Sequence, residues 1–173
     1  MFESNDTFVE EAVKSKETPQ MKAKKTGLIA IDIILLCCVI IGVHALISAV
    51  LLIISGIFTL IIMGNKNIEY EYDYTNGSLE IAKIINNEKR KKVVNIESSE
   101  VKLVAEIGTN ESLKYDHVQL KTYDCSAHDE NVKDYILVAH NEEKGYDFKV
   151  LFNPSEKLLN AMKRYNKSCI YTN

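Results

Sequence analysis

The sequence predicts a pair of membrane-spanning helices joined to a small α+β domain, a seven-stranded antiparallel barrel or roll capped by a C-terminal helix. Three features of the 173-residue chain lead to this prediction: an apolar block at 26–64, alternating segments between 67 and 152, and a helical repeat after 153. Alternation with period two indicates half-buried strands, and spacing of three or four residues indicates a helix. The expected parts are a cytoplasmic tail (1–25), a transmembrane hairpin (26–64) and a cytoplasmic domain (65–173).

The tail at 1–25 is mostly polar and carries one helical pattern. Thr7 and Glu10 form a capping box, and two apolar pairs with a spacing of four residues accompany it. We therefore expect a short amphipathic helix from Thr7 to Lys16, ended by Pro19. A helix of this length is marginal alone in water, so it is expected to dock on the lipid surface or on the domain.

The apolar block at 26–64 is nearly twice as long as one crossing requires. A helix rises 1.5 Å per residue, so about 20 apolar residues span the hydrocarbon core. Gly42 to His44 interrupt the block near its middle, which predicts one helix over 26–42 and a second over 44–63. The turn is expected at the far interface, because unpaired backbone groups are not tolerated in lipid.

Lysines flank the block on both sides and are absent from its central turn. Lys22, Lys24 and Lys25 precede the block, and Lys66 follows it. Cytoplasmic flanks carry an excess of positive charge, so both termini are predicted in the cytoplasm of a multi-pass protein of the cell membrane. A cleaved signal peptide is disfavoured, because the apolar stretch begins too late and is too long.

Asp32 is the one acidic residue inside the block. A charged aspartate at the centre of a crossing helix costs about 2.5–3.5 kcal/mol, and such residues often mark ion or proton paths. Folding the hairpin at Val43 brings Asp32 level with Ser55, whose hydroxyl can hydrogen-bond the carboxylate. Two interpretations stay open: Asp32 and Ser55 form a functional intramembrane polar site, or Asp32 lies near the cytoplasmic interface, where water and Lys25 reduce its cost.

The region after the block contains seven strand-like segments. The first alternates strictly, with Ile68 and three tyrosines on one face and acidic residues on the other, and Asn76-Gly77 follows it as a strong hairpin signal. The expected strands cover residues 67–74, 79–85, 92–96, 101–107, 117–124, 132–140 and 146–152.

A helix is predicted after the last strand. Asn153 is a suitable N-cap, Pro154 occupies the first helical position, and Glu156 lies three residues after the cap. An apolar stripe from Leu158 to Tyr165 follows. Seven antiparallel strands ending in one amphipathic helix is the element order of a pleckstrin-homology-like (PH-like) domain. Another small α+β roll, or an open meander covered by a helix, is the alternative.

Three segments of the chain occur in the same order in a known family. They are Phe8 to Lys14, the paired apolar helices, and residues 67–91, in which Asn67-Ile68-Glu69-Tyr70-Glu71-Tyr72 is the most distinctive stretch. The chain thus resembles a family of uncharacterised small membrane proteins from Gram-positive anaerobes. Its strand-turn-strand part is also similar to bacterial PH-like domains that follow membrane helices. The resemblance supports the PH-like fold and implies no activity, because fold alone does not determine function.

The basic run Lys89-Arg90-Lys91-Lys92 is the candidate contact for anionic lipid. Each such charge contributes about 1 kcal/mol near a membrane surface. The run is predicted in a connection between strands, where a solvated loop is the alternative interpretation. Phosphoinositide-binding PH domains usually carry basic residues around the first hairpin, and this hairpin is acidic, which argues against that ligand.

No catalytic, cofactor or metal site is predicted, and no enzymatic activity is expected. Cys125 and His128 are two potential ligands without a second pair at matching spacing. The sequence contains no evident nucleophile–base set or glycine-rich phosphate loop. The four cysteines are expected to stay reduced in the cytoplasm. The nearly neutral domain gives no indication of nucleic-acid binding.

The predicted function is a membrane-anchored cytoplasmic interaction module. Its expected partners are the lipid bilayer and an unidentified protein, and a homo-oligomer is left open. One alternative is a transporter accessory or an oligomeric membrane subunit that acts through the hairpin and Asp32. The other is a domain that senses anionic lipid through Lys89–Lys92.

Overall fold

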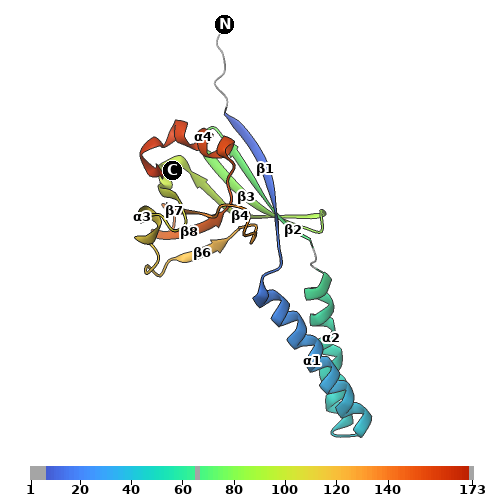
Figure 1. Ribbon diagram of the computed structural model, residues 1–173. Coiled ribbons are helices and arrows are strands. Elements are labelled where there is room, and N and C mark those ends of the chain that lie inside the picture. Colours follow the sequence, from blue (N-terminus) through green and yellow to red (C-terminus); the bar gives the residue numbers. More distant parts are fainter. Residues whose placement is uncertain (1–6, 65–66, 172–173) are drawn as a thin grey trace. The chain divides into compact units, whose positions relative to one another are not determined.

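The structure is a computed structural model that describes residues 7–64 and 67–171 and divides into two compact units (Figure 1). A β-rich unit combines the residues up to Lys16 with those from Asn67 onward, and a helical unit holds Glu17 to Lys66. The segment before the helices therefore belongs to the same unit as the segment after them, and it is not a separate tail. The predicted flanking residue Lys66 lies outside the described residues.

The helical unit contains α1 (Pro19–Ile41) and α2 (Ala45–Gly64), which are separated where the sequence predicts a break. The N-cap of α1 is Thr18, whose side chain accepts a hydrogen bond from the Met21 N–H at 3.2 Å. The helix ends at Gly42, where φ is 83°, a left-handed conformation that glycine adopts without strain. Pro19 begins this helix instead of ending an earlier one, because its missing N–H costs nothing at the first helical position.

The apolar side chains of the helical unit are largely exposed. No residue of α1 is buried, and the only buried residues of α2 are the polar Ser48 and Thr59. Among the described helices, α2 alone is long and apolar enough to cross a membrane. Length and composition thus identify one candidate span where the sequence predicts two.

The first sheet of the β-rich unit is an antiparallel meander, drawn from blue to green in Figure 1. Its strands, in spatial order, are β1 (Phe8–Ser15), β2 (Ile68–Thr75), β3 (Ser78–Ile85) and β4 (Lys89–Glu97). The β2–β3 turn has Asn76 and Gly77 at φ values of 48° and 96°, as a tight hairpin turn requires. The basic run Lys89–Lys92 lies on β4, so its prediction as a loop is wrong.

The predicted helix from Thr7 to Lys16 is wrong, because this segment forms strand β1. All eight of its residues pair with β2, from Phe8 opposite Thr75 to Ser15 opposite Ile68. The four-residue spacing that suggested a helix also places side chains on one face of a strand, because four is a multiple of two. Burial favours the strand over the helix, because pairing with β2 places Val9 in the core of the domain at 4% exposure.

The second sheet makes the domain a two-sheet structure instead of one antiparallel barrel. It has the order β6-β8-β7-β5-β9, in which β6–β8 and β5–β9 are parallel pairs. The predicted seven strands are all present, and β1 and β9 bring the described residues to nine. The bounds are β5 (Val101–Glu106), β6 (Lys121–Asp124), β7 (Tyr135–Asn141), β8 (Tyr146–Phe152) and β9 (Ile170–Tyr171), with short helices η1 (Ser98–Glu100), α3 (Asn110–Leu113) and η2 (Lys167–Cys169) between them.

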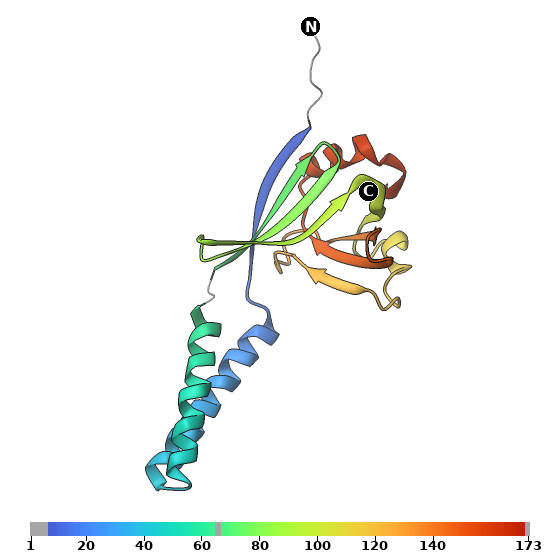
Figure 2. The same ribbon diagram turned by 180° about the vertical axis from the view of Figure 1, so that it is seen from behind.

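Helix α4 (Glu156–Tyr165) lies across one end of the two sheets (Figure 2). Its N-cap is Ser155, whose hydroxyl accepts from the Leu158 N–H at 3.2 Å. The cap lies two residues later than predicted at Asn153, so Pro154 precedes the helix and is not its first residue. Leu158 and Met162 are buried in one cluster with residues of both sheets. The helix thus closes the hydrophobic core, which is the role that the sequence predicts for it.

Candidate functional site

Strand β1 forms an open edge of the first sheet. The hydrogen bond at the start of the strand shows which residues of β1 bond to β2: the Asn76 N–H donates to the Thr7 carbonyl at 3.0 Å, so Thr7 and Asn76 are a hydrogen-bonded pair. In an antiparallel pair, hydrogen-bonded and non-hydrogen-bonded positions alternate. The odd-numbered residues of β1 therefore bond to β2. The backbone groups of the even-numbered residues point away from the sheet: Phe8, Glu10, Ala12 and Lys14.

The same alternation continues to the end of the strand. The Lys16 N–H, the next even-numbered position, donates to the Ala127 carbonyl at 2.8 Å, and the Lys16 ammonium pairs with Asp129 at 2.7 Å. The outward N–H and C=O groups of β1 can thus bond to a neighbouring backbone segment. At Lys16 a segment of the same chain, at Ala127, already does so. The open edge runs from Phe8 to Lys14.

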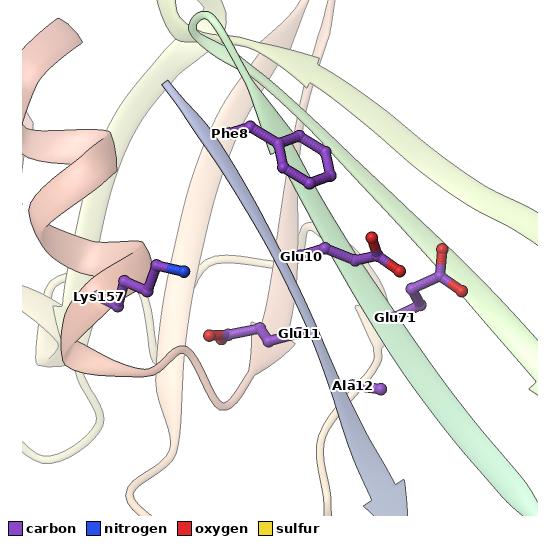
Figure 3. Close-up of a pocket in the computed structure, with 6 residues that line it drawn as sticks. All are labelled: Phe8, Glu10, Glu11, Ala12, Glu71 and Lys157. Atoms are coloured by element: carbon purple, nitrogen blue, oxygen red, sulfur yellow. The ribbon is translucent and has the colours of Figure 1, made fainter. Parts of the chain in front are cut away.

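A groove lies between this edge and helix α4 (Figure 3). It consists of two hollows of about 450 Å³ and about 290 Å³ that share Phe8 and Lys157 in their walls. The larger is lined by Phe8, Glu10, Glu11, Ala12, Glu71 and Lys157, and the smaller by Thr7, Phe8, Val9, Lys157, Asn160, Ala161 and Arg164. Phe8 is 59% exposed, an uncommon position for a phenyl ring in a wall of a groove.

Glu11 joins β1 to the beginning of α4. Its two carboxylate oxygens accept from the Ser155 N–H, at 2.8 Å, and from the Ser155 hydroxyl. The negative charge also lies near the helix N-terminus, where it is favourable. Figure 3 shows the Glu11 and Lys157 side chains extending into the space between strand and helix. This carboxylate thus holds the two walls of the groove together.

The outer face of the first sheet carries more acidic than basic groups. Arg90 pairs with Glu71 at 2.9 Å, with Asp73 at 3.2 Å and with Glu80 at 2.9 Å, and Lys92 pairs with Glu80 at 2.8 Å. Burial, followed by repulsion from Glu71, nevertheless raises the pKa of Asp73. Two residues of the predicted lipid-binding run are therefore engaged with carboxylates on their own sheet. Lys89 and Lys91 make no ion pair in the described part of the chain.

Three carboxylates of this face, those of Glu10, Glu71 and Asp73, have oxygens within 4.8 Å of one another. Arg90 already supplies a positive charge to two of them. Glu10 makes no hydrogen bond or ion pair with any described residue. The sequence did not single out this cluster, because Glu10 is separated from the others by the helical unit and was placed on a helix.

In the helical unit, Asp32 accepts hydrogen bonds from two hydroxyls of α2. Ser55 Oγ lies 2.5 Å from Oδ1, and Thr59 Oγ1 lies 2.7 Å from Oδ2. The contact between Asp32 and Ser55 is the one that the sequence predicts. Thr59 was missed, although it lies one helical turn after Ser55 and therefore on the same face.

The segment around Cys125 and His128 has the features of a structural loop. The Cys125 thiol is fully buried, and burial raises its pKa to about 12, so the free thiol is protonated at neutral pH. The Cys125 carbonyl accepts from the buried Tyr72 hydroxyl at 2.7 Å. His128 contacts Ser126 at 3.2 Å and Asp124 at 3.5 Å, both within its own loop.

The chain belongs to the family described as Bacterial PH-like domain (DUF6106), whose model matches residues 5–172. The match includes strand β1 and the helical unit as well as the strands that follow. It confirms the resemblance to an uncharacterised bacterial PH-like family. Neither a curated protein nor a solved structure matches the chain.

Proposed function

We propose that this member of the bacterial PH-like domain family is a membrane-anchored interaction module that holds an extended protein segment along β1. The observation that carries the proposal is the edge from Phe8 to Lys14, whose outward backbone groups face a groove beside α4. Strand addition at a sheet edge is a common mode of peptide recognition, in which backbone bonds supply affinity and side-chain pockets supply specificity.

The energetics of strand addition suit a contact of moderate affinity. Each backbone hydrogen bond contributes about 0.5–1.5 kcal/mol net, and ordering a flexible segment offsets part of this. The groove adds specificity through its charges, with Glu10 and Glu71 on the strand side and Lys157 and Arg164 on the helix side. Phe8 offers an apolar contact at the end where the two hollows meet.

Membrane anchoring by both helices is the second part of the proposal. The exposed apolar surface of α1 and α2 suits contact with lipid, and the two buried residues of α2, Ser48 and Thr59, are polar. Pairing of Asp32 with two hydroxyls reduces the cost of a carboxyl group within a bilayer. The β1–β2 pairing supports termini on one side of the membrane, because both strands belong to one sheet.

A proline at position 12 tests the use of the edge. Proline lacks an N–H, and the Ala12 N–H points outward, so Ala12→Pro removes a donor for the added strand while leaving the β1–β2 bonds intact. The full chain, with wild-type, Ala12→Pro or Ala12→Val sequence, is crosslinked in its native membrane and the attached proteins are identified by mass spectrometry. We expect Ala12→Pro alone to lose the crosslinks of β1. Equal crosslinks from all three chains would refute the proposal.

Asp32 supports one alternative function, a membrane subunit that acts through the helical unit. Its carboxylate is held by two hydroxyls instead of a basic residue, an arrangement that a proton-linked role could use. Asp32→Asn is expected to leave the crosslinks of β1 unchanged if the helices serve only as an anchor. A loss of function in cells with those crosslinks intact would favour this alternative.

Lipid sensing through Lys89–Lys92 is the weaker alternative, because Arg90 and Lys92 already pair with carboxylates. Reconstituting the full chain beside anionic or neutral lipid and replacing Lys89 and Lys91 by Gln tests it. A change in membrane contact of β4 that depends on both the charge of the lipid and the two lysines would support it.

A further inference from the structure

We infer that the segment that pairs with β1 is the β1 strand of a second copy of this chain, so that two chains share one continuous sheet. The inference rests on the proposed use of the β1 edge and names its occupant. The two strands are antiparallel, and a two-fold axis passes through Ala12. Each copy presents the same surface to the other, as closed dimers commonly do.

Two unpaired charges on β1 make this arrangement self-complementary. Glu10 and Lys14 lie on the outer face of the strand, and neither makes an ion pair in the described part of the chain. With Ala12 opposite Ala12, Glu10 of each copy lies opposite Lys14 of the other. Opposite charges directly across a strand pair are stabilising, and the two-fold axis forms this pair twice.

Neighbouring registers are less favourable. An axis at Glu10, Glu11 or Lys14 would place each of these charged residues directly opposite its own copy, and like charges in that position are destabilising. An axis at Val13 would rely on an ion pair between Glu10 and Lys16 of the second copy, but the Lys16 ammonium already pairs with Asp129 at 2.7 Å and its N–H already bonds to the Ala127 carbonyl at 2.8 Å. An axis at Ala12 places the uncharged Phe8 opposite Lys16, so the strand pair is confined to residues 10–14 and needs nothing from Lys16. Ala12 is therefore the favoured centre.

The backbone of β1 fits the same register. Glu10, Ala12 and Lys14 have outward N–H and C=O groups, so each can form a hydrogen-bonded pair with its opposite residue, exchanging both bonds. Ala12 has a small side chain at the axis, so the two copies of this residue can lie directly opposite each other without crowding. The inner face then places Glu11 opposite Val13, with no like charges in contact.

A short strand pair is a small interface, and confinement to one membrane would strengthen it. Anchoring both copies in the same bilayer raises their effective concentration without adding contacts. The dimer is accordingly expected in the membrane and is tested there, in the full chain.

The test uses cysteine crosslinking at the proposed axis. Cys37, Cys38 and Cys169 are replaced by serine, and the fully buried Cys125 is retained. In the proposed register the two Ala12 Cα atoms lie about 5.5 Å apart, within disulfide range. The control is Phe8→Cys, an exposed position on the same strand, whose two copies would lie about 27 Å apart. Mild oxidation in native membranes should give a disulfide dimer for Ala12→Cys and not for Phe8→Cys.

Charge reversal tests the register. In chains that carry Ala12→Cys, Glu10→Lys alone or Lys14→Glu alone should lower dimer formation about five- to thirtyfold, since two pairs change from attraction to repulsion. Coexpression of the two differently tagged single variants should restore a mixed dimer, and the double variant should restore its own. Tyrosine fluorescence during heating confirms that each variant is folded.

The outcomes separate this inference from the proposed function. Absence of the Ala12→Cys dimer, or a dimer that ignores the charge reversals, overturns the pairing of two copies. If Ala12→Pro still loses crosslinks to another protein in that case, the edge binds a different chain and the proposed function stands. If Ala12→Pro keeps all the crosslinks of β1, both the pairing of two copies and the proposed function are refuted.

Discussion

Replacing Glu11 should release the first strand from helix α4 and destabilise the β-rich unit. The carboxylate accepts from the Ser155 N–H at 2.8 Å and from the Ser155 hydroxyl. Hydrogen bonds to a charged group contribute about 1.5–3 kcal/mol when shielded from water, and an acidic group near a helix N-terminus adds about 0.3–1 kcal/mol. Because this contact is partly exposed, we expect Glu11→Ala to lower the free energy of unfolding by about 1–2 kcal/mol.

The measurement is thermal unfolding of the full chain in nanodiscs, followed by tyrosine fluorescence. The chain has no tryptophan, and all nine tyrosines follow the helices, so the signal reports the β-rich unit alone. A loss of 1 kcal/mol corresponds to about 4 °C in a domain of this size. Glu11→Gln keeps one acceptor and should lose less, and Glu10→Ala on the same strand is the control. Equal midpoints for Glu11→Ala and Glu10→Ala would refute the described docking of β1.

Three further predictions concern the core, the acidic face and the chain topology. Tyr72→Phe should cost about 1–3 kcal/mol in the same assay, because it leaves the buried Cys125 carbonyl without a donor. Asp73→Asn should raise the melting temperature at neutral pH, because burial and then Glu71 raise the Asp73 pKa. The ionised form therefore costs stability in full above the folded-state pKa, and the gain should decline as pH falls through that pKa and vanish below the lower pKa of the unfolded chain. Residues 67–173 alone should aggregate, and joining residues 7–15 to residue 68 by a short Gly/Ser turn should restore a folded domain, because β1 and β2 are antiparallel neighbours.

Much of the domain follows from local sequence patterns. Strict alternation around Tyr72 identifies β2, and Asn76-Gly77 identifies its turn, because the side chains and the left-handed φ angles are properties of adjacent residues. Helix α4 is likewise specified by its N-terminal residues and its apolar stripe. The contact between Asp32 and Ser55 could be predicted because the break at Gly42 sets how the two helices are aligned.

The features that sequence reasoning missed depend on long-range pairing. Residues 8–15 fit a helix and a strand equally well by spacing, and only the distant β2 decides between them. The parallel pair β6–β8 likewise forms between segments that are not adjacent in the chain. Arg90 could not be assigned to the acidic face without knowing that β4 lies beside β3. The candidate site could therefore not be predicted from the sequence, because it depends on the pairing of β1 with β2.

The pairing of β1 with β2 also constrains how the chain can cross a membrane. The two strands share eight residue pairs, from Phe8–Thr75 to Ser15–Ile68, so they must lie on the same side of any bilayer. If the chain between them crosses a bilayer, we therefore predict an even number of crossings. A single crossing by α2 would leave β1 on the opposite side and would uncover the core around Val9. Engineered cysteines at the exposed position 8 of β1 and near the C-terminus should therefore be labelled from the same side in intact cells, and labelling from opposite sides would contradict the sheet as described.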